Sequence, residues 1–254
     1  MGQMLISAVA QADGCILAAA TVRPGHELIG RDAGQAVGER ALGVAISTDE
    51  GKLFQASQVV IDFTRAEASA RYARRAAETG TPLVIGTTGI TAEQQQAIDD
   101  AAERVAIVQA PNMSVGVVLL AALVEEVART LPPDFDIEIV EAHHRHKVDA
   151  PSGTALALGA AAAAGRQIGL ESSAIRGRDG HTGARPRGAI GFASLRGGDI
   201  VGDHTVLFAG AGERIELTHR ATSRQIYAVG ALRAARWVIG RPPGRYDMRD
   251  VLEL

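Results

Sequence analysis

Short apolar runs alternate with helical periodicity through the first half of the chain. Parallel strands that are buried on both faces are apolar at nearly every position, whereas strands with one solvent-exposed face alternate. Nearly continuous runs therefore predict buried parallel strands at residues 15–22 (CILAAATV), 59–63 (VVIDF), 83–86 (LVIG) and 105–109 (VAIVQ). Helices are predicted between them, from the apolar spacing in residues 4–12 and from a capping-box sequence at Thr91 and Gln94. This alternation is typical of a doubly wound α/β domain.

The pattern changes after the proline pair Pro132-Pro133. Strands with few helices between them are predicted at residues 136–142, 189–195, 199–208 and 214–219, as in an α+β unit. Residues 223–240 return to a helical pattern, which Pro242-Pro243 ends. The apolar stretch 115–124 is too short to cross a bilayer and is followed at once by two glutamates, which favours an amphipathic helix. The second half therefore predicts a separate, mixed unit.

Composition narrows the class of protein without naming a function. A chain of 254 residues can form one large domain or two modest ones. The net charge of −3 and the absence of a long basic run with aromatics give no reason to expect a nucleic-acid partner. Cys15 is the only cysteine and no signal-peptide pattern opens the chain, so we expect a cytoplasmic protein without disulfides or a membrane partner.

The densest chemistry lies in residues 141–155 (EAHHRHKVDAPSGTA), between a predicted strand and a predicted helix. Ser152 is a plausible N-cap for the alanine-rich helix that follows, and the first turn of a helix favours anions. Imidazole and ammonium groups beside such a turn suit a negatively charged substrate that must gain a proton at neutral pH.

This segment closely resembles the signature of the dihydrodipicolinate reductase family. Further matching stretches are VIDFT (60–64), VIGTTG (84–89), APNMSVG (110–116), GHTG (180–183), GGDIVGD (197–203) and LTHRATSR (217–224). The resemblance implies NAD(P)H-dependent reduction of 4-hydroxy-tetrahydrodipicolinate to tetrahydrodipicolinate in the diaminopimelate route to lysine, by a homotetramer. It also implies a Rossmann-like nicotinamide dinucleotide-binding domain at residues 1–114 and 224–254, and a substrate-binding and tetramerisation domain at residues 115–223.

Roles in the chemistry follow from the same resemblance. His143 is expected to act as general acid/base and Lys147 as proton donor, although which of the two delivers the proton stays open. His144 is expected to bind one substrate carboxylate. The other carboxylate is expected to lie against Ser152, Gly153 and Thr154.

Cofactor contacts are likewise implied by resemblance. They are expected at Gly86, Thr87 and Thr88 after one strand, and at Ala110, Pro111, Asn112 and Met113 after the next. Arg224 is expected to help clamp the closed state. Arg23 follows the second Rossmann strand, where contact with a 2′-phosphate would favour NADPH over NADH, but a solvated loop arginine is equally compatible with the sequence.

The N-terminus departs from the family pattern. Met1-Gly2-Gln3 aligns with the end of the Gly-rich turn, so the expected first strand and most of the phosphate-binding loop are missing. We expect a natural chain roughly 15 to 20 residues longer, the length of one strand with its loop. The alternative is a catalytically impaired or non-catalytic dicarboxylate-binding homologue.

Other interpretations carry less weight. Zinc binding by the histidines and Asp149 is disfavoured because two histidines are adjacent and no HExxH or Cys/His pairing accompanies them, so no metal is expected. A different nicotinamide-dependent enzyme, such as an amino-acid dehydrogenase, would not need contacts for two carboxylates. A mobile basic surface loop is expected to hold His181, Arg185 and Arg187, and satisfied structural roles are expected for His204 and His219.

Overall fold

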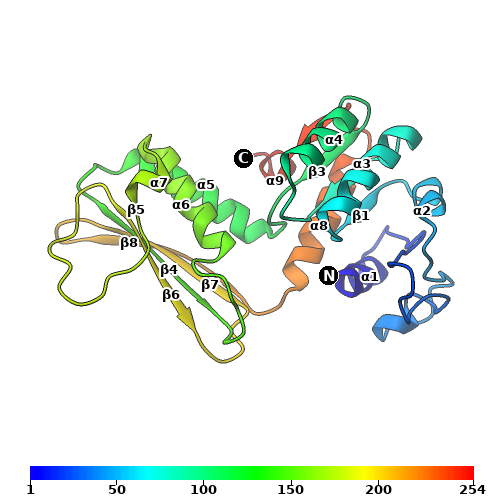
Figure 1. Cartoon of the computed structure of the whole chain (residues 1–254), viewed down its shortest axis with the longest axis horizontal. Coiled ribbons are helices and arrows are strands. Elements are labelled where there is room, and N and C mark those ends of the chain that lie inside the picture. The colour runs from blue at the N-terminus through cyan, green and yellow to red at the C-terminus, as the bar shows by residue number, and fades with distance from the viewer. The chain divides into compact units, whose positions relative to one another are not determined.

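A computed structural model describes residues 1–254 as two compact units (Figure 1). The first combines Met1–Val115 with Gln225–Glu253, and the second spans Gly116–Arg224. The expected domain boundaries differ from these by one residue at each crossing. The functions expected of the two parts stay predictions.

The first unit is built on a parallel sheet. Its strand order is β1-β2-β3-β9, and the strands are β1 (Val60–Asp62), β2 (Leu83–Ile85), β3 (Ala106–Gln109) and β9 (Gly244–Tyr246). Three of them fall inside the apolar runs predicted at residues 59–63, 83–86 and 105–109, which confirms those strands. All carboxyl ends meet at one edge of the sheet because every pair is parallel.

Helices cover both faces of this sheet, as in a doubly wound fold. One face packs on α2 (Glu50–Ala56), α3 (Ala66–Thr79) and α4 (Ala92–Ala102), in a core that includes Phe54, Tyr72 and Ile98. The other face contacts α8 (Gln225–Val238), against which α1 (Gly2–Gln11) and α9 (Met248–Leu252) also pack. The short η1 (Gln35–Val37) contacts α1. The Thr91–Gln94 capping box is present at the start of α4, which confirms that prediction.

The strand predicted at residues 15–22 is wrong. The segment has no strand beyond an isolated parallel bridge between Thr21 and Ser47, and Ile16 is 91% exposed. The sheet ends at β1, and the segment does not pair with that edge strand. Its backbone bonds to Ser47 through the N–H of Val22 and the carbonyl of Ala20, and it runs as irregular chain despite its apolar composition.

The second unit holds a mixed five-stranded sheet of order β5-β6-β4-β7-β8. Its strands are β4 (Asp136–His143), β5 (Ala174–Ile175), β6 (Ile190–Arg196), β7 (Gly202–Ala209) and β8 (Arg214–Ala221). The central β4 pairs in parallel with β6 and antiparallel with β7. The four strands predicted in this half are present, although β7 begins three residues later than the predicted 199.

One face of this sheet is covered by helices. α5 (Val115–Thr130) and α6 (Gly153–Arg166) pack on it, around a core that includes Ile139, Leu158 and Phe208, and the short α7 (Leu170–Ser173) follows α6. Gly165 allows the close approach of the two helices, because a Cβ there would collide with the backbone of Glu125. On the opposite face Val140 and Leu195 are exposed. No helix in either unit combines the length and apolarity needed to span a bilayer.

Arg185 does not behave as the side chain of a mobile surface loop. Its guanidinium donates to Asp136 at 2.7 Å, to Glu138 at 2.8 Å and to the carbonyl of Ala189 at 2.6 Å, and its side chain is 18% exposed. The expectation for this residue is therefore corrected, since these bonds tie it to β4.

Candidate functional site

At the carboxyl end of β4, two polar side chains lie on the face of the sheet that the helices cover. Side chains two apart on a strand share a face, so Glu141 and His143 continue the row that begins with the core residues Ile137 and Ile139. Glu141 is 1% exposed and His143 is 9% exposed. A buried carboxylate at a position that the pattern reserves for apolar residues requires partners.

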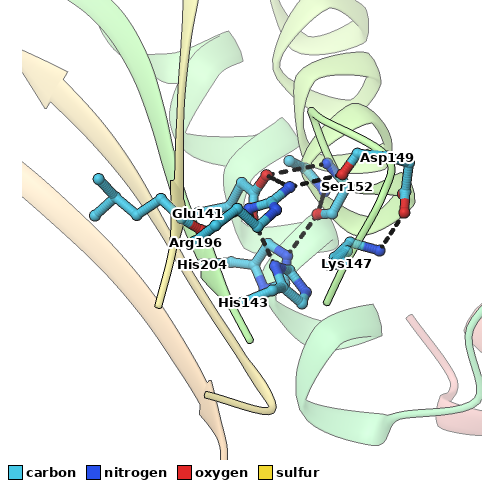
Figure 2. A network of polar contacts seen from close by, with 9 residues as sticks. Glu141, His143, Lys147, Asp149, Ser152, Arg196 and His204 are labelled. Atoms are coloured by element: carbon cyan, nitrogen blue, oxygen red, sulfur yellow. Dashed lines mark hydrogen bonds and ion pairs between the residues drawn. The ribbon is translucent and has the colours of Figure 1, made fainter. Parts of the chain in front are cut away.

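Glu141 is the centre of a polar network (Figure 2). Arg196, the last residue of β6, donates to both carboxylate oxygens at 2.8 Å. The backbone N–H of Ser152 donates to Oε1 at 3.3 Å, and Nδ1 of His143 lies 2.6 Å from Oε2. Burial alone would raise the pKa of Glu141, but side-chain hydrogen bonds with Arg196 first, then Ser194 and His143, outweigh it and lower the pKa to about 2. The carboxylate is therefore anionic at neutral pH.

The anionic carboxylate determines the tautomer of His143. Burial lowers the pKa of this imidazole, against the opposing effect of Glu141, so the ring is neutral at pH 7. The proton of the neutral ring sits on Nδ1, because only a donor there satisfies Glu141. Nε2 is left with a lone pair. It faces Gly202, where an added Cβ would lie 3.1 Å from it.

A second imidazole supports the start of α6. His204 on β7 places Nε2 2.9 Å from Oγ of Ser152, and that hydroxyl accepts the N–H of Ala155 at 3.1 Å. Ser152 is therefore the N-cap of α6, as the sequence predicted. Burial lowers the pKa of His204 to about 4, so its ring is neutral at pH 7.

The expectation of satisfied histidines is only half right. His204 uses one ring nitrogen, but its Nδ1 has no hydrogen-bond partner, and the same is true of Nδ1 of His219 on β8. The two rings come from register neighbours on β7 and β8. The rings of His143 and His204 pack edge to face with centroids 5.1 Å apart. Three histidines thus line adjoining strands at this end of the sheet.

Lys147 reaches the same region from the loop between β4 and α6. Its ammonium group pairs with the exposed carboxylate of Asp149 at 2.8 Å, an interaction that lowers the pKa of Asp149. The loop is attached to the network, because Arg196 also donates to the carbonyl of Asp149 at 2.7 Å. His144, directly after β4, is half-buried with its ring 6.3 Å from that of His146. An incoming anion can therefore displace the exposed carboxylate of Asp149 from the ammonium group of Lys147.

Gly153 and Thr154 form the first turn of α6, beside this cluster. The turn's N–H groups and the helix dipole favour an anion there. The second unit therefore brings together every predicted catalytic and substrate-binding residue: His143, His144, Lys147, Ser152, Gly153 and Thr154 (all between β4 and the first turn of α6).

The expected cofactor residues lie in the first unit, except Arg224, which ends the second. A pocket of about 500 Å³ opens at the carboxyl ends of β2, β3 and β9, and Thr87, Thr88, Ala110 and Pro111 are among its lining residues. Carboxyl ends of parallel strands are where open α/β sheets bind nucleotides. The hydroxyl and main-chain groups of this lining fit a nicotinamide nucleotide.

The remaining expected cofactor residues are not among those that line this pocket. The carboxamide oxygen of Asn112 accepts the N–H of Ser114 at 2.8 Å, and Met113 is buried, with 1% of its surface exposed. Gly86 directly follows β2. Arg23 and Arg224 are exposed and are not among the residues that line the pocket.

Comparison with known proteins identifies the family. The profile described as "Dihydrodipicolinate reductase, N-terminus" matches residues 1–113, and "Dihydrodipicolinate reductase, C-terminus" matches residues 116–252. The chain belongs to the dihydrodipicolinate reductase family. It is accordingly an NAD(P)H-dependent oxidoreductase whose cofactor is NADH or NADPH.

Relatives named 4-hydroxy-tetrahydrodipicolinate reductase match the whole chain. The protein of Thiobacillus denitrificans is 58% identical over 254 residues, covering 100% of this chain and 95% of that protein. The protein of Magnetococcus marinus is 55% identical over 252 residues, covering 99% of this chain and 94% of that protein.

Solved structures agree on the fold. A dipicolinate-bound dihydrodipicolinate reductase from Paenisporosarcina sp. TG-14 superposes with a TM-score of 0.77 at 27% identity, over 97% of this chain and 92% of that one. An amine dehydrogenase from Mycobacterium smegmatis, 14% identical with a TM-score of 0.59 over 96% and 91% of the two chains, shares the fold alone. The Rossmann-like class expected from the sequence is confirmed.

Two members of the network, Glu141 and Arg196, carried no role in the sequence-based reasoning, and His204 was expected only to be a satisfied structural histidine. Glu141 had a usable signal, because it stands at an inward position of an alternating strand. Arg196 had none, since its pairing with β4 spans 55 residues of sequence.

Proposed function

We propose that this enzyme reduces 4-hydroxy-tetrahydrodipicolinate to tetrahydrodipicolinate, in the diaminopimelate route to lysine. One observation supports this most strongly: a buried network joins the imidazole of His143 to the N-cap of an anion-favouring helix, with Lys147 on the loop between them. A dicarboxylate that must be protonated needs these groups together. The relatives' names and the dipicolinate bound to the Paenisporosarcina enzyme support the same substrate class.

In this proposal the first unit binds the cofactor and the second unit binds the substrate. The first holds the cofactor through Gly86, Thr87 and Thr88 and through the turn from Ala110 to Met113, with Pro111 and Asn112 between them. The exposed Arg23 is available to a 2′-phosphate, and the exposed Arg224 helps to clamp the closed state. The second unit binds the substrate and assembles a homotetramer, in the cytoplasm, where a single cysteine stays reduced.

Replacing the substrate hydroxyl with hydrogen requires a hydride and a proton, and releases one water. The reduced nicotinamide supplies the hydride when it is bound. Lys147 delivers the proton, because the neutral His143 presents a lone pair on Nε2 and has no proton to donate at that atom. His143 then accepts a hydrogen bond or a proton at that atom.

The substrate's two carboxylates are held at separate places. His144 binds one, and the first turn of α6, with Ser152, Gly153 and Thr154, binds the other. Substrate binding draws Lys147 away from Asp149, since the ion pair with that exposed carboxylate contributes little in solvent.

A kinetic assay of NAD(P)H oxidation with freshly prepared substrate tests this function. The chain has only two lysines, so Lys52→Met on the exposed surface of α2 is a matched control for Lys147→Met. We expect Lys147→Met to lower kcat by about 10²-fold or more, the usual contribution of a positioned proton donor, and Lys52→Met to have no effect. A Lys147→Met enzyme with normal kcat contradicts the assigned donor.

The alternative of a catalytically impaired or non-catalytic homologue gives a different result in the same experiment. Such a protein binds dipicolinate in a calorimetric titration but consumes NADH and NADPH slowly or not at all. Turnover of about 1 s⁻¹ or faster by the unmodified chain, the usual range for enzymes, rejects it.

A further inference from the structure

We propose that Glu141 is the positioning residue of this site: it orients His143 and the N-cap of α6 through one carboxylate, with Arg196 holding that carboxylate in place. The inference rests on the proposed reaction and adds two residues to it. Neither Glu141 nor Arg196 needs to touch the substrate in this role.

The two carboxylate oxygens serve different parts of the site. Oε2 receives Nδ1 of His143 at 2.6 Å, and Oε1 receives the backbone N–H of Ser152 at 3.3 Å. Arg196 bonds both oxygens at 2.8 Å, so the plane of the carboxylate cannot rotate without breaking a charge-assisted bond. Figure 2 shows the side chains of Glu141 and Arg196 close together, above His143 and to the left of Ser152 in this view.

This division makes Glu141→Gln an informative substitution. The carboxamide keeps the shape of the carboxylate but has one acceptor, its oxygen, and one donor, its NH₂. With the oxygen at the Oε1 position, it still accepts from Ser152 and from one nitrogen of Arg196. In either orientation the NH₂ group faces one nitrogen of Arg196 and one further donor. At the Oε1 position that donor is the backbone N–H of Ser152, which cannot become an acceptor, whereas at the Oε2 position it is Nδ1 of His143, which can, so the first orientation is preferred.

In the preferred orientation the NH₂ group faces Nδ1 of His143. The ring can satisfy that donor only by accepting at Nδ1, which moves its proton to Nε2. The lone pair at Nε2, next to Gly202, is then lost. Glu141→Gln should therefore change the tautomer of His143 while leaving the anion-binding turn of α6 intact.

Kinetics and binding separate these two effects. We expect Glu141→Gln to lower kcat by about 10²-fold or more, because the imidazole of His143 is then in the wrong tautomer. KM and the dissociation constant of dipicolinate should change by less than about threefold. Glu141→Leu, which also removes the acceptor for Ser152, should weaken dipicolinate binding as well. A Glu141→Leu chain that fails to fold leaves the Gln variant as the deciding case.

Glu138→Gln is the matched control. Glu138 lies on the same strand and is also held by two arginines, Arg178 and Arg185, but it makes no bond to His143 or Ser152. Its substitution should leave kcat and KM unchanged. A loss equal to that of Glu141→Gln would show that any broken ion pair on β4 impairs the enzyme, and would overturn the proposal.

Nitrogen-15 NMR of labelled histidine tests the inference independently of turnover. Comparison with the His143→Asn spectrum assigns the signals of His143 among those of the seven histidines. We expect a protonated Nδ1 in the unmodified chain and a protonated Nε2 in Glu141→Gln. An unchanged tautomer, or a kcat within threefold of the unmodified value, overturns the positioning role. Inactivity of the unmodified enzyme would instead count against the proposed reaction, and the NMR result would still decide the role of Glu141.

Discussion

Replacing Arg196 with methionine should destabilise the second unit strongly at neutral pH and much less in acid. The substitution keeps most of the side-chain volume but removes both 2.8 Å bonds to Glu141, which is 1% exposed. Removing one partner of a buried ion pair typically costs about 3–5 kcal/mol, because the remaining charge is buried without compensation.

The pKa of Glu141 gives a second route to the magnitude. Its fall from 4.5 to about 2 in the folded chain corresponds to about 3 kcal/mol of stability at neutral pH. Because the folded pKa lies below the unfolded one, this stability is present above pH 4.5 and is lost as the pH falls toward 2. In Arg196→Met, burial is no longer opposed by the guanidinium, so Glu141 takes up its proton at higher pH. The difference between the two proteins therefore shrinks on acidification.

Urea unfolding at pH 7 and pH 3 measures this difference. The only tryptophan, Trp237, and all three tyrosines lie in the first unit, so fluorescence follows that unit, whereas far-UV circular dichroism follows both. Arg178→Met is the control, because its partner Glu138 is partly exposed and the pair contributes about 1 kcal/mol or less. A destabilisation by Arg196→Met below about 1 kcal/mol at pH 7, or one that is equal at both pH values, would refute the reasoning.

Three further predictions concern separate parts of the molecule. Gly230→Ala on α8 should lower the melting temperature of the first unit, because a Cβ there would collide with the carbonyl of Met113; an unchanged thermal scan would contradict this. Ser152→Ala should raise KM for the dicarboxylate and destabilise the second unit by about 1 kcal/mol, the usual cost of a lost N-cap, measured by kinetics and urea unfolding. Arg23→Ala should raise KM for NADPH by about tenfold and leave KM for NADH unchanged if Arg23 contacts the 2′-phosphate; equal effects on both cofactors would reject that contact.

Local signals explain why much of the fold was predictable. Residues 83–86 and 105–109 are apolar at almost every position, and a short run of this kind is typical of a strand covered on both faces. The N-caps at Thr91 and Ser152 could be predicted from the sequence because capping depends on residues within one turn. The failure at residues 15–22 has the opposite cause, since an apolar run forms a strand only beside another strand.

The sequence singled out the segment that carries the candidate site, but not the contacts that its side chains make. His143 and Lys147 stand in one short segment whose composition and family resemblance point to chemistry. Arg196 and His204 reach that segment only through the pairing of β6 and β7 with β4, a choice of topology that no local pattern encodes. The buried position of Glu141 indicates that its carboxylate must have a partner, but only the pairing of β4 with β6 identifies that partner as Arg196.

A crystal structure of the chain with dipicolinate tests the central claim most directly. We predict one carboxylate against the first turn of α6 at Gly153 and Thr154, the other beside His144, and the ammonium group of Lys147 on the ligand instead of on Asp149. Nε2 of His143 should face the ring. Dipicolinate bound elsewhere, or bound here with Lys147 still paired to Asp149 and His143 turned away, would contradict the account.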